Sequence, residues 1–222
     1  MVIYDVKKCP LFMGINDSQL ETLLNCLTAT RRTYKKDSFI FREDGKAASV
    51  GIVLDGGVYV VKEDFWGSRV IIAYIKSGGL FGEALSCAGV EKLPVSVVAA
   101  EKSEIMLIDY RKLVTSCTSA CVFHAQLIKN MLHLLARENI MLTQKMEHMS
   151  KRTTREKLMS FLSFQAIKEK SNLVEIPFNR QDLADYLCVD RSALSRELGL
   201  MQKDGLLRYD KNRFELLRND YT

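Results

Sequence analysis

Two arginines and two serines near the C-terminus have the types and the spacing of a surface that contacts DNA. Within residues 191–199, Arg191, Ser192, Ser195 and Arg196 recur at intervals of one and three residues, which places them on one face of a helix. Arginine can form two hydrogen bonds with guanine in the major groove, and serine is short enough to let a helix backbone approach. The pattern predicts a DNA-contacting helix face.

The residues around this face predict two short helices joined by a tight turn. Asn179 is placed to cap the first helix, which Arg180 begins, and Asp190 is placed to cap the second. Gly205 ends the second helix, and two short apolar runs separated by a polar turn follow it. The apolar positions that would pack the helices together are Leu183, Ala184, Leu187, Val189, Leu194, Leu198 and Met201.

An ordinary helix pair with a solvated surface is the alternative, because polar outer faces are common. The hairpin that follows favours the winged helix-turn-helix unit instead, and with it DNA binding. We therefore predict that Arg180, Arg191, Ser192, Ser195 and Arg196 contact DNA.

Composition sets the broad class. The chain has 222 residues, of which 47% are hydrophobic and 27% charged, and its net charge is +5. These values suit a soluble protein of one large or two modest domains. No apolar run is long enough to cross a bilayer and no signal pattern opens the chain, so a cytoplasmic protein with no membrane partner is expected. Motifs for a nucleophile, a phosphate loop or a metal are missing, so we expect neither an enzyme nor a metal site.

The six cysteines show no paired short spacing of the zinc or iron–sulfur type. We expect reduced, mostly buried thiols. Cys117 and Cys121 are four residues apart and share a helical face, and whether they are redox-active stays open.

Short β-rich runs between Arg32 and Asp109 predict a small antiparallel barrel or roll. The expected strands are Val50–Leu54, Val58–Val61, Val70–Ile75, Val95–Ala99 and Ile105–Ile108. A short helix comes before them, and Ser18 and Glu21 are placed as its capping box.

A long helix is predicted from residue 123 to residue 149, where no glycine or proline occurs. One apolar seam recurs at alternating steps of four and three residues: Ile128, Leu132, Leu135, Asn139, Leu142, Met146 and Met149. A second stripe lies beside it: Leu127, Met131, Leu134 and Met141. Each apolar stripe must be buried against another surface. We therefore expect the helix to contact its own β domain with one stripe and an identical helix with the other, in a parallel homodimer. A core helix of a single chain is the alternative.

Residues 150–154 are polar and interrupt the apolar pattern, and Thr153 with Glu156 would cap a further helix. The expected domains are a β-roll sensor domain (1–122), a dimerisation helix (123–149) and a winged helix-turn-helix domain (150–222).

This order resembles the Crp/Fnr family of bacterial transcription regulators. The most specific stretches are Gly79-Leu-Phe-Gly-Glu83, Arg180-Gln-Asp-Leu-Ala and Arg191-Ser-Ala-Leu-Ser-Arg196. The resemblance implies an α+β fold with an N-terminal cyclic-nucleotide-binding-type β-roll, a long dimerisation helix and a C-terminal winged helix-turn-helix. It implies base contacts by Arg191 and Arg196.

The chain departs from the family at three positions in this unit. Ser192 stands where glutamate is frequent, Cys188 where glycine is usual and Glu197 where an apolar residue is usual. The resemblance also implies a symmetric homodimer on a near-palindromic operator in double-stranded DNA, with RNA polymerase and a small-molecule effector as further partners. It leaves open whether the bound protein activates or represses.

The effector is not expected to be cyclic AMP. Members that bind it carry an Arg-Ser pair on the cyclic phosphate, and those positions fall on Leu93 and Pro94 here. A buried phosphodiester needs a fixed cation or donor cluster, which Leu-Pro does not offer, and Lys92 would have to turn inward. The expected pocket suits a mostly apolar ligand with one polar group. Its residues are Leu80, Phe81, Gly82, Glu83, Ala84, Leu85, Leu93, Pro94, Leu127 and Met131.

The identity of the effector stays open, as do the cofactor and whether any effector exists. A regulator that senses through haem or a thiol is one alternative, for which His124, His133 and His148 on the long helix are the histidines available. An iron–sulfur centre is not expected, because only Cys9 precedes the first helix. The other alternative is a cyclic-nucleotide-type sensor module that acts by protein contact.

Overall fold

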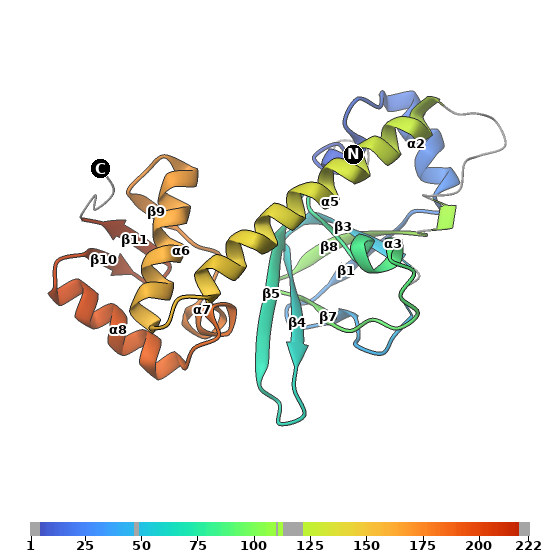
Figure 1. Cartoon of the computed structure of the whole chain (residues 1–222). Helices are drawn as coiled ribbons and strands as arrows, with labels where there is room; N and C mark the ends of the chain where they lie inside the picture. Colours follow the sequence, from blue (N-terminus) through green and yellow to red (C-terminus); the bar gives the residue numbers. More distant parts are fainter. Residues whose placement is uncertain (1–4, 47–48, 110, 113–121, 218–222) are drawn as a thin grey trace. The chain divides into compact units, whose positions relative to one another are not determined.

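The computed structural model describes residues 5–46, 49–109, 111–112 and 122–217. They belong to two compact units, Met1–Asn139 and Ile140–Thr222, and the long helix α5 (Val122–Met149) crosses from one to the other (Figure 1). The first unit is a β domain and the second a small helical unit with a three-stranded sheet. The α+β class predicted from the sequence is confirmed. Cys117 and Cys121 lie outside the described residues.

The first unit contains two four-stranded antiparallel sheets, with strand orders β1-β8-β3-β6 and β2-β7-β4-β5. The strands are β1 (Thr30–Tyr34), β2 (Phe39–Phe41), β3 (Ser49–Asp55), β4 (Gly57–Glu63), β5 (Arg69–Lys76), β6 (Leu80–Phe81), β7 (Ser96–Ala99) and β8 (Ser103–Asp109). Each of the five predicted strands corresponds to one of them.

One part of the core fills the roll. Phe81 is 1% exposed and packs with Val53, Val58 and Ile105. Gly51 on β3 makes room for it, because a Cβ at this position would come within 2.0 Å of the Phe81 ring. A larger side chain would therefore displace the ring from a close-packed core.

The other part of the core lies between the roll, the N-terminal helices η1 (Pro10–Phe12) and α2 (Asp17–Cys26), and the first half of α5. The capping box of α2 lies two residues before the predicted one. Asn16 accepts from the Gln19 backbone at 2.9 Å, and the Gln19 side chain accepts from the Asn16 backbone at 3.3 Å. The predicted Ser18–Glu21 box is thus wrong, because Asn and Gln fill the same two roles two residues upstream.

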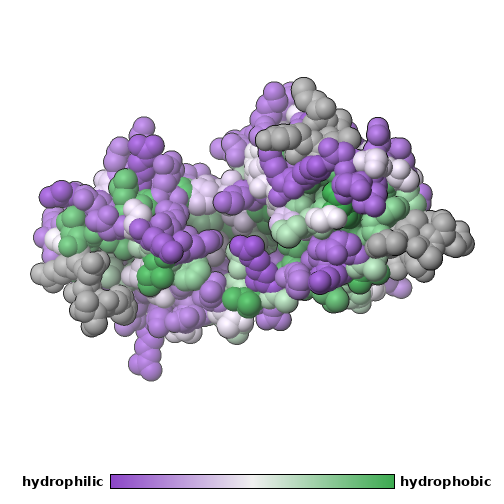
Figure 2. All heavy atoms as spheres, turned by 90° about the horizontal axis from the view of Figure 1, so that it is seen from above, coloured by the Kyte–Doolittle hydropathy of each residue, from purple (hydrophilic) through white to green (hydrophobic). Residues whose placement is uncertain are grey.

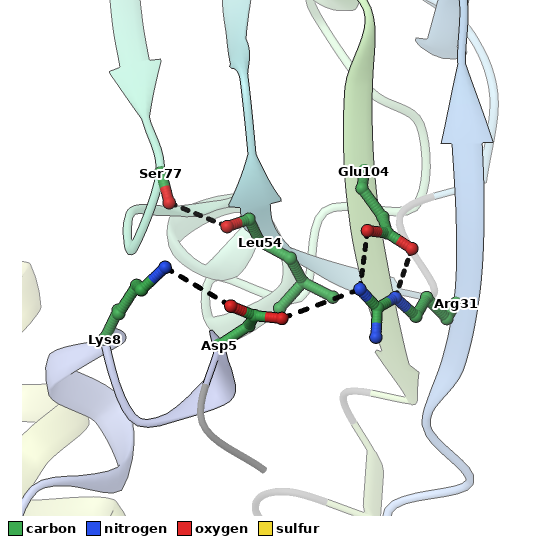
Figure 3. A network of polar contacts seen from close by, with 6 residues as sticks. All are labelled: Asp5, Lys8, Arg31, Leu54, Ser77 and Glu104. Carbon is green, nitrogen blue, oxygen red and sulfur yellow. Dashed lines mark hydrogen bonds and ion pairs between the residues drawn. The ribbon is translucent and has the colours of Figure 1, made fainter. Parts of the chain in front are cut away.

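A polar network joins the N-terminal segment to the roll (Figure 3). Arg31 on β1 forms an ion pair with Glu104 on the adjacent strand β8, and its Nη2 lies 3.7 Å from Asp5. Lys8 pairs with the same Asp5 carboxylate at 3.3 Å. Glu104 raises the pKa of Arg31 through this bond, and its own pKa is lowered in return. The groups are largely solvated, so the network positions the segment more than it stabilises the fold.

Helix α5 is fixed to the first unit by three neighbouring residues. Leu127 and Met131 are 0% and 4% exposed and belong to the core. Between them, the Asn130 Nδ2 donates to the carbonyls of Leu11 and Met13, at 2.8 Å each. Because a buried carbonyl without a partner is costly, Asn130 ties the N-terminal segment to this helix.

The second unit begins on the last turns of α5. It contains α6 (Thr154–Glu169), β9 (Leu173–Glu175), α7 (Arg180–Leu187), α8 (Arg191–Lys203), β10 (Leu207–Asp210) and β11 (Arg213–Leu216). The predicted Thr153–Glu156 capping box of α6 is confirmed. The sheet order is β10-β11-β9, so the predicted hairpin gains a third strand from before the helix pair.

The hairpin between β4 and β5 ends in two exposed aromatic residues. Phe65 is 95% and Trp66 86% exposed. The Asp64 carboxylate accepts hydrogen bonds from the backbone N–H groups of Trp66 at 3.0 Å and Ser68 at 2.8 Å, which fixes the turn.

The surface view shows mainly hydrophilic residues with separate hydrophobic patches (Figure 2). None of the helices among the described residues is long and apolar enough to span a membrane.

Candidate DNA-binding interface and effector site

The helix pair α7 and α8 is shaped by its caps. The Asn179 side chain accepts from the backbone N–H groups of Gln181 at 2.8 Å and Asp182 at 3.0 Å, which starts α7 as predicted. Cys188 ends α7 with a φ of 49°, a left-handed conformation that usually favours glycine. Asp190 is the N-cap residue of α8, but its side chain makes no capping hydrogen bond. The turn therefore retains the geometry of a helix-turn-helix although it has no glycine.

Helix α8 has a buried back and an open front. Leu194, Leu198 and Met201 are fully buried. The four α8 residues predicted to contact DNA are all exposed on the opposite side: Arg191, Ser192, Ser195 and Arg196. The front is therefore free to enter a groove of the duplex.

A groove of about 660 Å³ opens beside the start of both helices. Arg180 from α7, Arg191 from α8 and Lys211 from the β10–β11 turn line it, and all three side chains can carry positive charge. The Arg180 guanidinium lies over the rings of Tyr209 at 4.7 Å and Phe214 at 5.2 Å, which holds it in place. Burial lowers the pKa of Arg180, yet an arginine stays charged at neutral pH. Cationic side chains gathered around one groove can attract phosphate oxygens.

Sequence reasoning missed Lys211. It occupies the turn between the two strands of the predicted hairpin, with a φ of 51°. Its place in the turn between β10 and β11 could have predicted a DNA contact, because the tip of such a hairpin can reach the DNA backbone next to the recognition helix.

The departure at Glu197 has a structural explanation. Its carboxylate lies 2.5 Å from Arg155 on α6, and Arg155 also pairs with Asp204 at 2.8 Å. Since Glu197 is only partly exposed, this three-residue cluster attaches α8 to α6 at a place where the family usually uses apolar packing.

The predicted effector residues fall into two groups. Leu80, Leu127 and Met131 come together in one core cluster, and Phe81 belongs to the other. Leu93 is also buried, whereas Ala84 and Pro94 are exposed and Leu85 is half-buried. The structure thus brings part of the predicted set together and leaves two members on the surface.

The Phe-Gly-Glu stretch turns sharply into α3 (Glu83–Cys87). Gly82 has a φ of 82°, a conformation that disfavours other residues, and Glu83 that follows is 4% exposed. Burial first, and then Glu83, raise the pKa of Glu138 on α5. Glu138 was not predicted, because a single glutamate in a charged helix carries no pattern.

The segment at Leu93 contains no phosphate ligand like that of cyclic AMP receptors. Leu93 is 5% exposed, and Lys92 beside it is exposed. The Lys62 Nζ donates to the Pro94 carbonyl at 3.1 Å and pairs with Glu43 at 3.3 Å. The charge of Lys62 is therefore already paired with Glu43.

Helix α5 also carries an exposed apolar face. Exposed fractions are 42% for Ile128, 61% for Leu132, 50% for Leu142 and 71% for Met146. Leu135 is partly buried against the core of the first unit. Asn139 is exposed and Met149 half-buried. Ile140 and Met141 are exposed as well, so the apolar face is wider than the predicted seam.

Metal and haem ligands are sparse. No group of three or more His, Cys, Asp or Glu residues in the described part of the chain could hold a metal ion. His148 is buried and hydrogen-bonds Ser160 at 2.8 Å, while His133 is exposed. Burial also raises the pKa of the Cys9 thiol to about 12, which makes that cysteine unreactive.

Two domain families match the chain. The cyclic nucleotide-binding domain matches residues 31–119, and the Crp-like helix-turn-helix domain matches residues 156–220. The chain belongs to the Crp/Fnr family of transcription regulators. It is therefore a DNA-binding regulator with a cyclic-nucleotide-binding-type effector domain, and the family consists of regulators rather than enzymes.

Individual relatives are distant. The transcriptional activator protein FnrA of Stutzerimonas stutzeri is 25% identical over 213 residues, 94% of this chain and 84% of its own. FixK2 from Bradyrhizobium japonicum has a TM-score of 0.68 at 23% identity, covering 86% of this chain and 93% of its own. The regulator CLP of Xanthomonas campestris has a TM-score of 0.74 at 19% identity, covering 91% of this chain and 100% of its own. At these identities the two structures support the fold alone.

Proposed function

We propose that this Crp/Fnr protein is a homodimer that binds DNA sequence-specifically through α8, and that an effector in the roll controls its DNA affinity. The observation that carries the proposal is the front of α8. It presents Arg191, Ser192, Ser195 and Arg196 together, next to the basic groove of Arg180. Exposed arginines with short neighbours can reach base edges, while the groove residues bind the backbone.

The exposed apolar face of α5 supports the homodimer. Its exposed leucine, isoleucine and methionine side chains follow the predicted heptad seam, and an identical helix would cover them. A parallel pair would give the two α8 helices the two-fold symmetry that a near-palindromic operator requires.

Selection from random DNA duplexes with the full chain tests DNA recognition directly. We expect a symmetric motif with half-sites about one helical turn apart. Affinities for the selected duplex and for a shuffled one should be compared at the same salt concentration, because the non-specific component depends on salt. Equal affinity for both duplexes, or no bound DNA, would contradict the proposal. The second outcome would favour a sensor that acts by protein contact.

Cyclic AMP and cyclic GMP are not expected to bind with regulatory affinity. The buried Leu93 and the backbone of Pro94 offer no donor for the cyclic phosphate, and desolvating that charge without a partner is costly. Titration calorimetry on the full chain should detect no binding with a dissociation constant of micromolar or tighter. Such a constant would correspond to a binding free energy of about −8 kcal/mol. The same preparation must bind the selected duplex, which shows that it is active. A micromolar or tighter dissociation constant would overturn this prediction.

A further inference from the structure

Arg180 is the first residue of α7, but its side chain is held by the hairpin of β10 and β11, which we call the wing. The guanidinium lies 4.7 Å from the centre of the Tyr209 ring and 5.2 Å from that of the Phe214 ring. Tyr209 and Phe214 are direct partners across the antiparallel hairpin, so their rings lie on the same face of it. The wing therefore supplies both aromatic contacts of Arg180.

The aromatic contacts leave the hydrogen-bond donors of Arg180 available. A guanidinium carries five N–H donors, and a cation over a ring is attracted to it without using any of them. No carboxylate in the part of the chain that the structure describes forms an ion pair with Arg180, Arg191 or Lys211. All three side chains line the same groove. The groove therefore holds positive charge that these described carboxylates do not neutralise.

The turn of the wing is fixed close to Arg180 by Asn212. The Asn212 Nδ2 donates to the Ile176 carbonyl at 3.0 Å, and the Asn212 carbonyl accepts from the Ile176 backbone N–H at 3.0 Å. Ile176 precedes Arg180 by four residues, and Lys211 adjoins Asn212 in the turn. Two reciprocal hydrogen bonds therefore join the turn that carries Lys211 to the segment that leads into α7.

An arginine that is held in place should bind a phosphate more tightly than a free one. A free arginine side chain samples many rotamers and loses this freedom when it binds. Arg180 is half-buried against the wing, so much of this freedom is already lost in the folded chain. Less conformational entropy is then lost when DNA binds.

Tyr209 is the ring that can be changed with the least effect on the core. Phe214 is fully buried and belongs to the core of the second unit. Tyr209 is half-buried, and its neighbours on β10, Arg208 and Asp210, are exposed. A substitution at Tyr209 therefore tests the contact with Arg180 more directly than one at Phe214.

We propose that Tyr209 is a positioning residue that holds the Arg180 guanidinium so that it and Lys211 bind a phosphate of the DNA backbone next to α8. The proposal rests on the proposed function, because the ligand is the duplex that α8 reads. A phosphodiester fits the groove because its unesterified oxygens accept hydrogen bonds and carry negative charge. Such a contact does not depend on the base, so the wing adds affinity and α8 adds sequence preference.

NMR of the arginine Nε–H groups in the full chain tests the ring contact without DNA. The ring current of an aromatic face shifts nearby protons upfield, so the Arg180 signal should lie upfield of the signals of exposed arginines. Its loss in Arg180→Gln assigns it. In Tyr209→Leu it should move towards the position of the exposed arginines. A wild-type Arg180 signal at that ordinary position would overturn the proposal.

Affinity for the selected duplex tests the positioning role. Arg180→Gln should weaken binding roughly tenfold and reduce the salt slope by about one, as loss of one phosphate contact does. Tyr209→Leu should weaken binding roughly three- to tenfold, by the same factor for the selected and the shuffled duplex. Tyr209→Phe keeps the ring and should restore most of this loss. Lys168→Gln removes an exposed charge from α6 and is the control, with little expected effect.

A double-mutant cycle separates positioning from support of the fold. If Tyr209 acts through Arg180, Tyr209→Leu should have little further effect in the Arg180→Gln background. An equal loss in both backgrounds would show that Tyr209 only supports the wing, and would overturn the proposal. A loss confined to the selected duplex would also overturn it, because Tyr209 would then contact a base.

Melting curves show whether Tyr209→Leu is folded. If it is not, Arg180→Lys takes its place in the test, because lysine keeps the charge but lacks the planar group that lies over the rings. We expect a loss of roughly three- to tenfold in affinity from this variant as well. Affinity equal to that of the wild type would overturn the proposal.

Failure of the proposed function gives a different pattern from failure of this inference. A chain that selects no duplex, with the Arg180 signal shifted upfield, would contradict sequence-specific DNA binding. A chain that selects a duplex, with the Arg180 signal at its ordinary position, would contradict only the role of Tyr209.

Discussion

Replacing Leu132 by glutamate is expected to dissociate the dimer and abolish operator binding together. Leu132 is 61% exposed in the single chain and lies in the middle of the apolar face of α5. In a parallel dimer the change would place two carboxylates against each other in an apolar seam, where neither could be solvated or paired. Each lost leucine also forfeits roughly 1.5–3 kcal/mol of burial.

Sedimentation measures the dimer, and gel shift with the selected duplex measures binding. His133→Glu is the matched control, because His133 is exposed on the same helix but outside the seam. Leu132 is a sharper choice than Leu135, which is partly buried against its own core and would confound folding with dimerisation. Two results would contradict dimerisation through this seam of α5. One is a Leu132→Glu protein that remains dimeric, and the other is a wild type that is monomeric while bound to its operator.

Arg196→Ala is expected to cost about 1–3 kcal/mol of specific binding and to relax the base preference at one position of each half-site. The guanidinium is exposed on the front of α8, whose backbone is fixed by three buried side chains. Removal should therefore eliminate a contact without unfolding the helix.

Affinity for the selected duplex, for its single-base variants and for a shuffled duplex separates the possible roles. Lys168→Ala removes an exposed charge from α6 and serves as the control for a change in net charge alone. If Arg196→Ala weakens specific and shuffled DNA by the same factor, Arg196 contacts only phosphate.

The sequence predicted the elements with strong periodicity. The helix pair could be predicted because its apolar residues and the Asn179 cap agree, and the long helix because its seam spans several heptads. Strand β9 was missed because three residues carry no usable pattern, and it becomes a strand only by pairing with β11. The cap of α2 was misplaced because two overlapping polar pairs fit the same motif.

The candidate site was predicted less completely than the fold. The front of α8 follows from spacing alone, because one helix carries all four residues. Lys211 lines the same groove as Arg180, which is distant from it in the chain, and only the fold brings the two together. Tertiary pairing of this kind leaves no periodic signal in a single sequence.

The exposed hairpin turn of the roll has a spectroscopic consequence. Trp66 is the single tryptophan of the chain and is 86% exposed. Its indole is already in contact with water in the native fold, so its emission will be nearly the same in the folded and the unfolded protein. Tryptophan fluorescence is consequently a poor measure of unfolding for this chain, and a blue shift would instead report that something has covered the tip of the hairpin.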